Sequence, residues 1–371
     1  MELEFTPEQE ELRSAIRSVL VGDCPIGLVR EIVEKGASPD ALWERQVELD
    51  WPALTVPSQY GGVGLTFVEL AVMAEELGRV MAPGPLLATV SQFTPLVREV
   101  APPEVAGPLL SRVAHGEISG TLAIAGADGS WSARTPPVQA TRDGASWRLE
   151  GVAHWVMDGA GADEIAVVAR CAGTDELAAF VVSSEAVVTT PFRAMDLSRS
   201  VAAVAFDAVS VGPERVLAAP AGAEAVGRAL EEATVALALE TVGTCQSIFD
   251  IDLDYARERQ QFGVPIGSFQ AMKHKFANMY VALEKARAVC YFAAATIAEN
   301  DPRRGLAAAM AKAAAGDCEH LLGLEGIQCL GGIGFTWEHD MHLYIKRAKT
   351  NGVLFGGTHV HRARVADLLG M

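Results

Sequence analysis

The stretch that decides the fold runs from Tyr255 to Gln270 and reads Tyr255-Ala-Arg-Glu-Arg259-Gln-Gln-Phe262-Gly-Val-Pro265-Ile-Gly267-Ser-Phe269-Gln270. Long helical patterns lead into it and out of it, but Gly263, Pro265 and Gly267 interrupt the periodicity within five residues. The sequence therefore predicts a joint, with Arg259 in the last turn of one helix and Gln270 in the first turn of the next.

The side chains at this joint suit an anionic, ring-bearing ligand. Arg259 offers a planar fork of donors that matches a phosphate or diphosphate, and Phe262 offers a flat face for a ring system. An alternative interpretation needs no ligand: Arg259 could satisfy the carbonyls at the helix C-terminus while Phe262 is buried.

Composition limits the classes of partner. The chain has 371 residues, enough for two or three domains, and it is 50% hydrophobic but only 6% aromatic, with many alanines that favour closely packed helices. The 30 basic and 47 acidic residues give a formal net charge of −17. Nucleic acid is therefore an improbable partner, and an anionic ligand must be bound by a few local cations.

The cysteines and the hydropathy pattern indicate a reducing compartment. No Cys-x-x-Cys pair is present, no secretory segment follows Met1, and nowhere do eighteen apolar residues run together. We expect a cytoplasmic protein with no membrane span. The six cysteines are Cys24, Cys171, Cys245, Cys290, Cys318 and Cys329.

The patterning predicts three domains of an α+β protein. Residues 1–117 show helical spacing from the N-cap signal at Thr6 onward, and residues 118–220 contain short β-branched runs typical of a small antiparallel barrel or sandwich. Residues 221–371 contain four helical stripes, which we expect to close as an antiparallel bundle. No Rossmann or Walker glycine motif occurs, so a dinucleotide would not be bound in Rossmann fashion.

A second motif reads Gln328-Cys-Leu-Gly331-Gly332-Ile-Gly334-Phe-Thr-Trp337-Glu338. Its glycines permit a ligand to approach the backbone closely, and Gln328 can hydrogen-bond to a base or a phosphate ester. A helix C-cap followed by a tight loop would need the same glycines.

Together the two motifs resemble those of the acyl-CoA dehydrogenase family, and the helix–β–helix order matches along the whole chain. Val56-Pro-Ser-Gln-Tyr-Gly-Gly-x-Gly64-Leu65 and Glu75-Glu-Leu-Gly-Arg79 are also similar to family signatures. The resemblance implies FAD and an acyl-CoA thioester bound between a helical domain, a β domain and a four-helix bundle. A carboxylate removes the α-proton, hydride passes to the flavin, and electrons leave through an electron-transferring flavoprotein.

The family resemblance assigns the joint to the cofactor of a neighbouring subunit. In relatives, the arginine of the Arg-x-x-Phe-Gly motif and two glutamines reach across a dimer interface to the adenosine diphosphate half of the partner's FAD. The matching cofactor-binding residues of this chain are Arg259, Phe262, Gln270, Gln328, Gly331 and Gly332.

This chain differs from the family pattern at both positions of the catalytic glutamate. That glutamate lies either in a C-terminal Tyr-Glu-Gly-Thr loop, which here reads Phe355-Gly-Gly-Thr358, or 22 residues before the motif tyrosine, which here is Ala233 (255 − 22 = 233). We therefore predict no catalytic residue in this chain. The nearby Glu231 and Glu232 are interpreted as surface charges, with Glu232 as the alternative base, and Glu240 is expected to bond within the bundle.

The flavin loop of the β domain also differs from the family pattern. Where many relatives have Thr-Glu-Pro-x-Ala-Gly-Ser-Asp, this chain has Ile124-Ala-Gly-Ala-Asp-Gly-Ser-Trp131. The resemblance implies that the flavin-facing hydroxyl is absent and that Trp131 could obstruct the site. Trp155 remains from the Lys-x-Trp-Ile-Thr pattern and is either a buried barrel residue or a cover for the flavin.

Two other chemistries find little support. His339 and His342, or His359 and His361, have conceivable ligand spacings, but further ligands would be needed, so no metal is expected. Gly-x-Ser-x-Gly is absent, which argues against nucleophilic hydrolysis.

These features lead to one hypothesis and two alternatives. The hypothesis is the non-catalytic subunit of an α2β2 acyl-CoA dehydrogenase, which contributes to the FAD site of a glutamate-bearing partner and resembles the enzymes of actinobacterial steroid side-chain degradation. The alternatives are a homotetrameric enzyme that uses Glu232 as its base, and a structural or binding protein of the same fold.

Overall fold

A computed structural model describes residues 4–371, and the chain within them divides into two compact units. One unit comprises Gly36–Leu70 and Pro83–Ala233 and contains the main sheet. The other, here called the helical unit, comprises the described residues up to Lys35, Ala71–Ala82 and Thr234–Met371. Two helices, α4 (Phe67–Arg79) and α8 (Ala223–Glu258), contribute to both.

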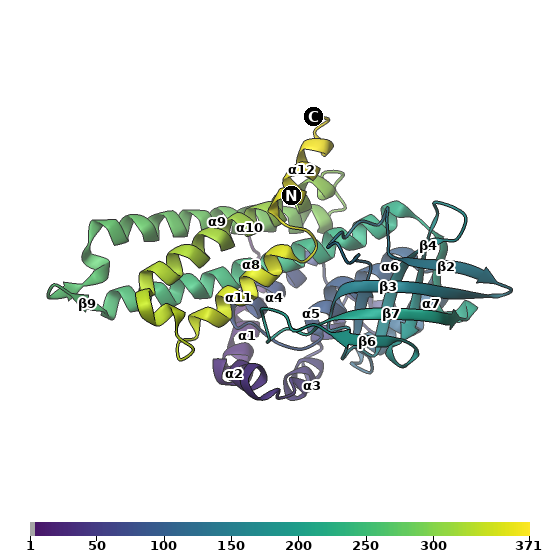
Figure 1. Cartoon of the computed structure of the whole chain (residues 1–371), viewed down its shortest axis with the longest axis horizontal. Helices are drawn as coiled ribbons and strands as arrows, with labels where there is room; N and C mark the ends of the chain where they lie inside the picture. Colours follow the sequence, from purple (N-terminus) through teal and green to yellow (C-terminus); the bar gives the residue numbers. More distant parts are fainter. Residues whose placement is uncertain (1–3) are drawn as a thin grey trace. The chain divides into compact units, whose positions relative to one another are not determined.

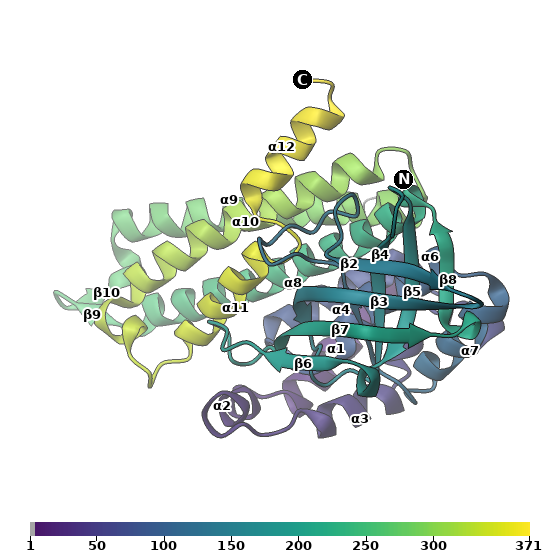
Figure 2. The same cartoon turned by 45° about the vertical axis from the view of Figure 1, so that its right-hand side comes forward.

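The sheet unit is built on eight strands in the order β6-β7-β3-β2-β4-β5-β8, with β1 paired to β4 (Figures 1 and 2). Alternating apolar residues of these strands form one core, which includes Val138, Val156, Val167 and Phe180. The strand bounds are β1 Gly120–Ala123, β2 Val138–Asp143, β3 Ser146–Met157, β4 Glu164–Cys171, β5 Leu177–Ser183, β6 Val188–Pro191, β7 Val201–Val211 and β8 Val216–Ala221.

The sheet is mixed, which corrects the expectation of an antiparallel β domain. Strands β1 and β2 both run parallel to β4, β1 along its first half and β2 along its second, while the other pairings are antiparallel. The chain reverses once at the β2–β3 hairpin and again between β3 and β4, so β4 returns in the direction of β2. Patterns of short strands report where strands occur but not how often the chain reverses between them.

Short helices complete the sheet unit. In chain order they are α3 Asp40–Glu48, η1 Trp51–Ala53, η2 Ser58–Tyr60, α5 Leu86–Ala88, the π-helical turn η3 Thr89–Phe93, α6 Thr94–Val100 and α7 Pro103–Ala114, followed by the turns η4 Ser184–Ala186 and η5 Pro213–Arg215. Thr89 bonds this helical part to the first strand, since its hydroxyl accepts the Gly120 N–H at 3.0 Å.

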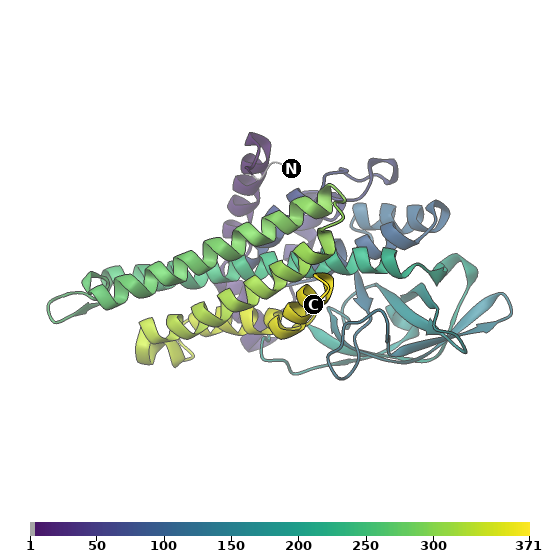
Figure 3. The same cartoon turned by 90° about the horizontal axis from the view of Figure 1, so that it is seen from above.

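The helical unit is dominated by long helices, as the stripes of residues 221–371 predict. Helices α9 (Gln270–Ala298) and α10 (Arg304–Leu330) lie side by side (Figure 3), and α11 (Met341–Val353) and α12 (Thr358–Leu368) pack on α10. Alanines at the α9–α10 contact allow a close approach, in which the Cys290 thiol lies 3.7 Å from the Ala311 carbonyl oxygen. The first helices, α1 (Pro7–Asp23) and α2 (Ile26–Lys35), belong to the same unit. The expected cap at Thr6 is confirmed, because its hydroxyl accepts the Gln9 N–H at 3.3 Å.

The Glu75–Arg79 signature holds this unit together. Glu75 accepts from the Arg287 guanidinium at 2.8 Å and from the Tyr291 hydroxyl at 2.5 Å, and Glu76 accepts from Arg17 at 2.6 Å. Gly78 allows α4 to lie against α8, because a Cβ there would stand 2.0 Å from a backbone oxygen of α8. The motif is thus explained by buried ion pairs and by one helix crossing.

Candidate functional site at the end of the helical unit

The predicted joint is a β-hairpin between two helices. Helix α8 ends at Glu258, strands β9 (Gln260–Gln261) and β10 (Val264–Pro265) pair, the turn η6 (Ile266–Ser268) follows, and α9 begins at Gln270, as expected. The backbone N–H of Arg259 donates to the Tyr255 carbonyl at 2.8 Å, which closes the helix end. Its carbonyl accepts from the Ile266 N–H at 2.8 Å, which closes the hairpin.

Phe262 and Gly263 form the two-residue turn at the hairpin tip. Their φ angles are 54° and 80°, and positive φ at both central positions is the requirement of a type I′ turn. Glycine adopts this conformation readily, but a bulky aromatic residue does so at a cost. Strain of this kind clusters at ligand-binding sites, so Phe262 is a candidate functional residue on backbone grounds alone.

The side chain of Phe262 projects into solvent. It is 94% exposed, and its edge-to-face contact with Phe269, at 6.2 Å between ring centroids, is the one ring contact found for it among residues 4–371. The alternative interpretation of a buried Phe262 is therefore wrong. A two-residue turn directs its first side chain outward, and no element of the described chain covers the tip.

The polar residues of the joint are also exposed. Across residues 4–371, the side chains of Arg259, Gln270 and Gln328 make no hydrogen bond or ion pair with another residue. The helix end is closed by the backbone of Arg259, not by its guanidinium. In a chain with net charge −17, this cation makes no ion pair among residues 4–371 and is available to an external anion.

The second motif lies at the same end of the helices as the hairpin (Figures 1 and 2). Gln328 lies in the last turn of α10, Gly331 caps that helix with φ 66°, and the turn η7 (Gly331–Phe335), here called the Gly-rich turn, follows. The expected C-cap and the exposed loop are thus both present. Ile333 is 45% exposed and Phe335 is 76% exposed, so the turn presents apolar side chains beside its glycines.

Glu232, the candidate base, is not a surface charge, which corrects the sequence interpretation. Its side chain is buried, and its carboxylate accepts from Arg98 Nη2 at 2.5 Å. Glu231 is buried as well. The helical pattern of α8 did not reveal that Glu232 is buried, because its partner Arg98 comes from a helix more than a hundred residues earlier.

Glu240 bonds within the helical unit, as predicted. Its side chain is 1% exposed, and its two carboxylate oxygens accept from Arg347 Nη1 at 2.8 Å and from Asn351 Nδ2 at 2.9 Å. Gly356, the glutamate position in the C-terminal loop, has a φ of 93° and lies two residues before the start of α12. Ala233 is buried within α8.

The flavin loop of the sheet unit contains no polar side chain at its first position. Ile124 is buried, and the following residue, Ala125, accepts the His154 N–H at 2.9 Å. Trp155 is 36% exposed and lies on the ring of Phe192, with 4.9 Å between centroids, so the interpretation of Trp155 as a buried barrel residue is wrong. Trp131 is half-buried.

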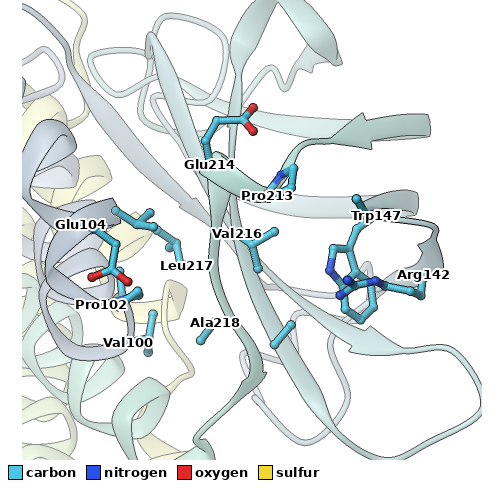
Figure 4. Close-up of a pocket in the computed structure, with 14 residues that line it drawn as sticks. Val100, Pro102, Glu104, Arg142, Trp147, Pro213, Glu214, Val216, Leu217 and Ala218 are labelled. Carbon is cyan, nitrogen blue, oxygen red and sulfur yellow. The ribbon is translucent and has the colours of Figure 1, made fainter.

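The sheet unit has a cavity of its own. A cavity of about 900 Å³ in the sheet unit lies between the α6–α7 link and β8, with Arg142 over the Trp147 ring at one side (Figure 4). It contains none of the predicted site residues. No group of three or more His, Cys, Asp or Glu residues suited to a metal ion occurs among residues 4–371, and none of their helices is long and apolar enough to cross a membrane.

Helix α2 contacts the end of the second motif, which the sequence did not predict. Arg30 and Glu34 of α2 bond to the segment Trp337–Asp340, which follows the Gly-rich turn. The motif ends in Trp337 and Glu338, whose side chains could have indicated a polar contact, but nothing in the sequence identifies α2 as the partner.

Comparison with known proteins agrees with this arrangement. Residues 6–117 match the family model described as acyl-CoA dehydrogenase, N-terminal domain, and residues 221–370 match the corresponding C-terminal domain. The chain is 31% identical over 349 residues to the acyl-CoA dehydrogenase IpdE2 of Mycobacterium tuberculosis, covering 93% of this chain and 92% of that protein. It is 34% identical over 320 residues to FadE34 of the same organism, covering 85% of this chain and 40% of the relative.

Solved structures show the same fold. The ChsE4-ChsE5 complex from Mycobacterium tuberculosis matches with a TM-score of 0.90 at 24% identity, covering 100% of this chain and 99% of the matched chain. A variant of the Tcur3481-Tcur3483 steroid ACAD matches with a TM-score of 0.87 at 26% identity, covering 98% of each chain.

Proposed function

This chain belongs to the acyl-CoA dehydrogenase family, whose members are FAD-dependent oxidoreductases acting on acyl-CoA thioesters, and from this premise we propose that it is the non-catalytic subunit of a heteromeric enzyme. It binds the adenosine diphosphate half of the FAD held by a homologous, glutamate-bearing subunit. The observation that carries the proposal is a contrast. The side chains of Arg259, Phe262, Gln270 and Gln328, which the proposal assigns to the partner's cofactor, are exposed, whereas Glu232 and Glu240 are buried and bonded.

The residues at the joint fit the diphosphate of FAD. Arg259 supplies a cation with no carboxylate partner among residues 4–371, and Gln270 and Gln328 supply amides for the ribose, base or phosphate oxygens. Phe262, on its strained turn, supplies an aromatic face. The glycines at 331 and 332 allow the ligand to approach the backbone.

The residues at this chain's own flavin loop fit FAD less well. Ile124 occupies the position of the family's flavin-facing hydroxyl, and its side chain is buried, so it offers no hydrogen bond to a ring. FAD, when bound, accepts the hydride from the substrate. Within the proposal, this chain's residues hold and orient that cofactor, and the proton is removed by the partner's glutamate.

We assign the substrate class as an acyl-CoA thioester carrying a steroid side chain. The support is the similarity to IpdE2 and to the steroid ACAD named above. Electrons would leave through an electron-transferring flavoprotein.

The test is flavin content of the co-purified complex. Arg259→Ala removes one charge-assisted contact of about 1.5–3 kcal/mol, which corresponds to weaker FAD binding by about 10-fold to 150-fold. Arg257→Ala is a matched control, because Arg257 lies two residues away on the exposed end of α8 and pairs with Asp254. Wild-type FAD affinity in Arg259→Ala would remove this residue from the site.

Stoichiometry separates the proposal from a homotetrameric enzyme with Glu232 as base. An α2β2 complex with one complete site per unlike dimer should carry two flavins, and Glu232→Gln should leave kcat nearly intact. Four flavins per tetramer, or a fall in kcat of about a hundredfold in Glu232→Gln, would favour the homotetramer instead. A chain that binds no flavin in any complex would favour a structural role.

A further inference from the structure

Arg30 of helix α2 bonds to the segment that follows the Gly-rich turn through three separate contacts. Its Nε donates to Asp340 Oδ1 at 2.6 Å, and its Nη2 donates to the carbonyl oxygens of Trp337 and Glu338, each at 3.1 Å. Its remaining Nη1 pairs with Glu34 of the same helix at 2.8 Å. One guanidinium thus fixes two backbone carbonyls and one carboxylate, an arrangement that suits the planar, five-donor fork of arginine.

The indole of Trp337 is held from both sides. Its Nε1 donates to Glu34 Oε1 at 3.0 Å, while its ring stacks on His342 at 4.7 Å and lies 4.8 Å from the ammonium of Lys346. His342 and Lys346 belong to α11, whereas Glu34 belongs to α2. The segment is therefore anchored by two helices from distant parts of the sequence.

The carboxylate of Asp340 binds Arg30 and does not cap α11, where His339 Nδ1 accepts the Met341 N–H at 3.1 Å. Asp340 occupies the N-cap position of α11, where an aspartate normally accepts a backbone N–H of the first turn, yet its side chain makes no such bond. The carboxylate is directed to Arg30 instead.

The anchored segment follows a turn whose apolar side chains are largely exposed. Phe335 is 76% exposed, Ile333 is 45% exposed and Gln328 is exposed. A loop that must present such groups to another molecule loses less conformational entropy on binding if it is already ordered. The hydrogen bonds of Arg30 to Trp337, Glu338 and Asp340 order the segment that follows the turn.

We propose that Arg30 is a positioning residue for the FAD contact made by Gln328 and the Gly-rich turn. The inference rests on the proposed function, since it assumes that this turn meets the partner's FAD. Arg30 itself does not touch the cofactor. It acts by fixing the backbone at Trp337 and Glu338, and through it the orientation of the turn.

The experiment compares Arg30→Ala, Arg30→Lys and the control Arg362→Ala in the co-purified complex, with Arg259→Ala measured in parallel. Arg362 is an exposed arginine of the helical unit, bonded through one nitrogen to Asp317, so Arg362→Ala removes the same charge at a different position. Two quantities are measured: hydrogen exchange of the backbone amides of residues 331–336, and the dissociation constant for FAD.

In Arg30→Ala we expect exchange at residues 331–336 to accelerate about tenfold and the FAD dissociation constant to rise about tenfold, the scale of one charge-assisted hydrogen bond. The kcat of the flavin-saturated complex should stay within about twofold, because no reacting group changes. Arg30→Lys keeps the pairing with Asp340 but not both carbonyl contacts. Its exchange rate and its FAD dissociation constant should therefore lie between those of wild type and Arg30→Ala. Arg362→Ala should change neither quantity.

Two results would overturn the inference. If Arg259→Ala weakens FAD binding but Arg30→Ala does not, the proposed function stands and Arg30 has no positioning role. If neither variant weakens FAD binding, the proposed function fails and this inference fails with it.

Discussion

Glu240, in the middle of α8, and Arg259, directly after its end, are opposite in charge and in surroundings. Glu240 is fully buried, and both of its oxygens are bonded to Arg347 and Asn351. Arg259 is exposed, and its guanidinium has no partner among residues 4–371. A buried charge survives folding only when it is paired, whereas an exposed charge without a partner costs the fold little and remains free to bind.

Asp252 is the position where this comparison is tested, because it is buried like Glu240 and unpaired like Arg259. It lies on α8 between them, it is 0% exposed, and neither carboxylate oxygen has a hydrogen-bond partner. Burial, with a smaller contribution from Glu325, raises the pKa of Asp252 to about 8. The side chain therefore folds as the neutral acid at neutral pH.

Removing Glu240 should produce the largest effect. Glu240→Ala leaves the guanidinium of Arg347 buried without its carboxylate, and we expect the free energy of unfolding to fall by about 3–5 kcal/mol. Urea unfolding of the purified protein measures this, with Glu48→Ala as the control, since Glu48 pairs with Arg45 at the surface. A loss below about 1 kcal/mol would contradict the distinction between the buried middle of α8 and its exposed end.

Asp252 should make stability depend on pH in a defined window. Because its folded pKa lies near 8 and its unfolded pKa near 4, the folded chain binds one more proton between these values, and the unfolding free energy falls as pH rises from about 4 to about 8. Asp252→Asn should flatten this dependence on pH. At pH 8.5 its unfolding free energy should exceed that of wild type by about 2–4 kcal/mol. Asp254→Asn, at an exposed position of the same helix, should leave the slope unchanged.

A side chain at Gly356 should change the unfolding free energy less than the substitution of Glu240 or Asp252. The φ of 93° disfavours any L-residue, and a Cβ would stand 3.3 Å from His361 Nε2 and 3.4 Å from Val360 Cγ1. Gly356→Ala should lower the unfolding free energy by about 1–2 kcal/mol. Gly173→Ala is the control, since its φ of 81° imposes a similar backbone cost with no atom within 4 Å; equal losses in the two variants would show that the contacts at Gly356 do not matter.

Phe262 should show the smallest effect on stability, and in the opposite direction. Phe262→Asn places a residue that tolerates positive φ at the hairpin tip, so we expect the unfolding free energy to rise by about 0.5–1 kcal/mol while FAD binding in the complex weakens. Denaturant midpoints and FAD titration measure the two changes. A variant that loses stability would show that Phe262 belongs to the packed structure and not to the exposed, binding end of α8.

Much of the fold follows from local patterns, and particular residues show why. Gly263 and Pro265 placed the joint correctly, since glycine and proline close together disfavour a continuous helix, and Thr6 marked the first helix through its cap. The mixed direction of the sheet did not follow, because strand direction depends on how many reversals separate β2 from β4. The exposure of Phe262 did not follow either, since a hydrophobic side chain gives no sign of which packing surfaces reach it.

The sequence by itself determined the family, the order of helical and β segments, and the absence of a carboxylate at residues 233 and 356, because these depend only on residue identity and spacing. The tertiary structure decided which charges are engaged. Whether Glu232 is a free base or a partner of Arg98, and whether Glu240 or Arg259 is available to a ligand, depends on helices brought together from distant parts of the chain. Hydrogen bonds act over about 3 Å, so their partners are set by the packing of helices and not by distance along the sequence.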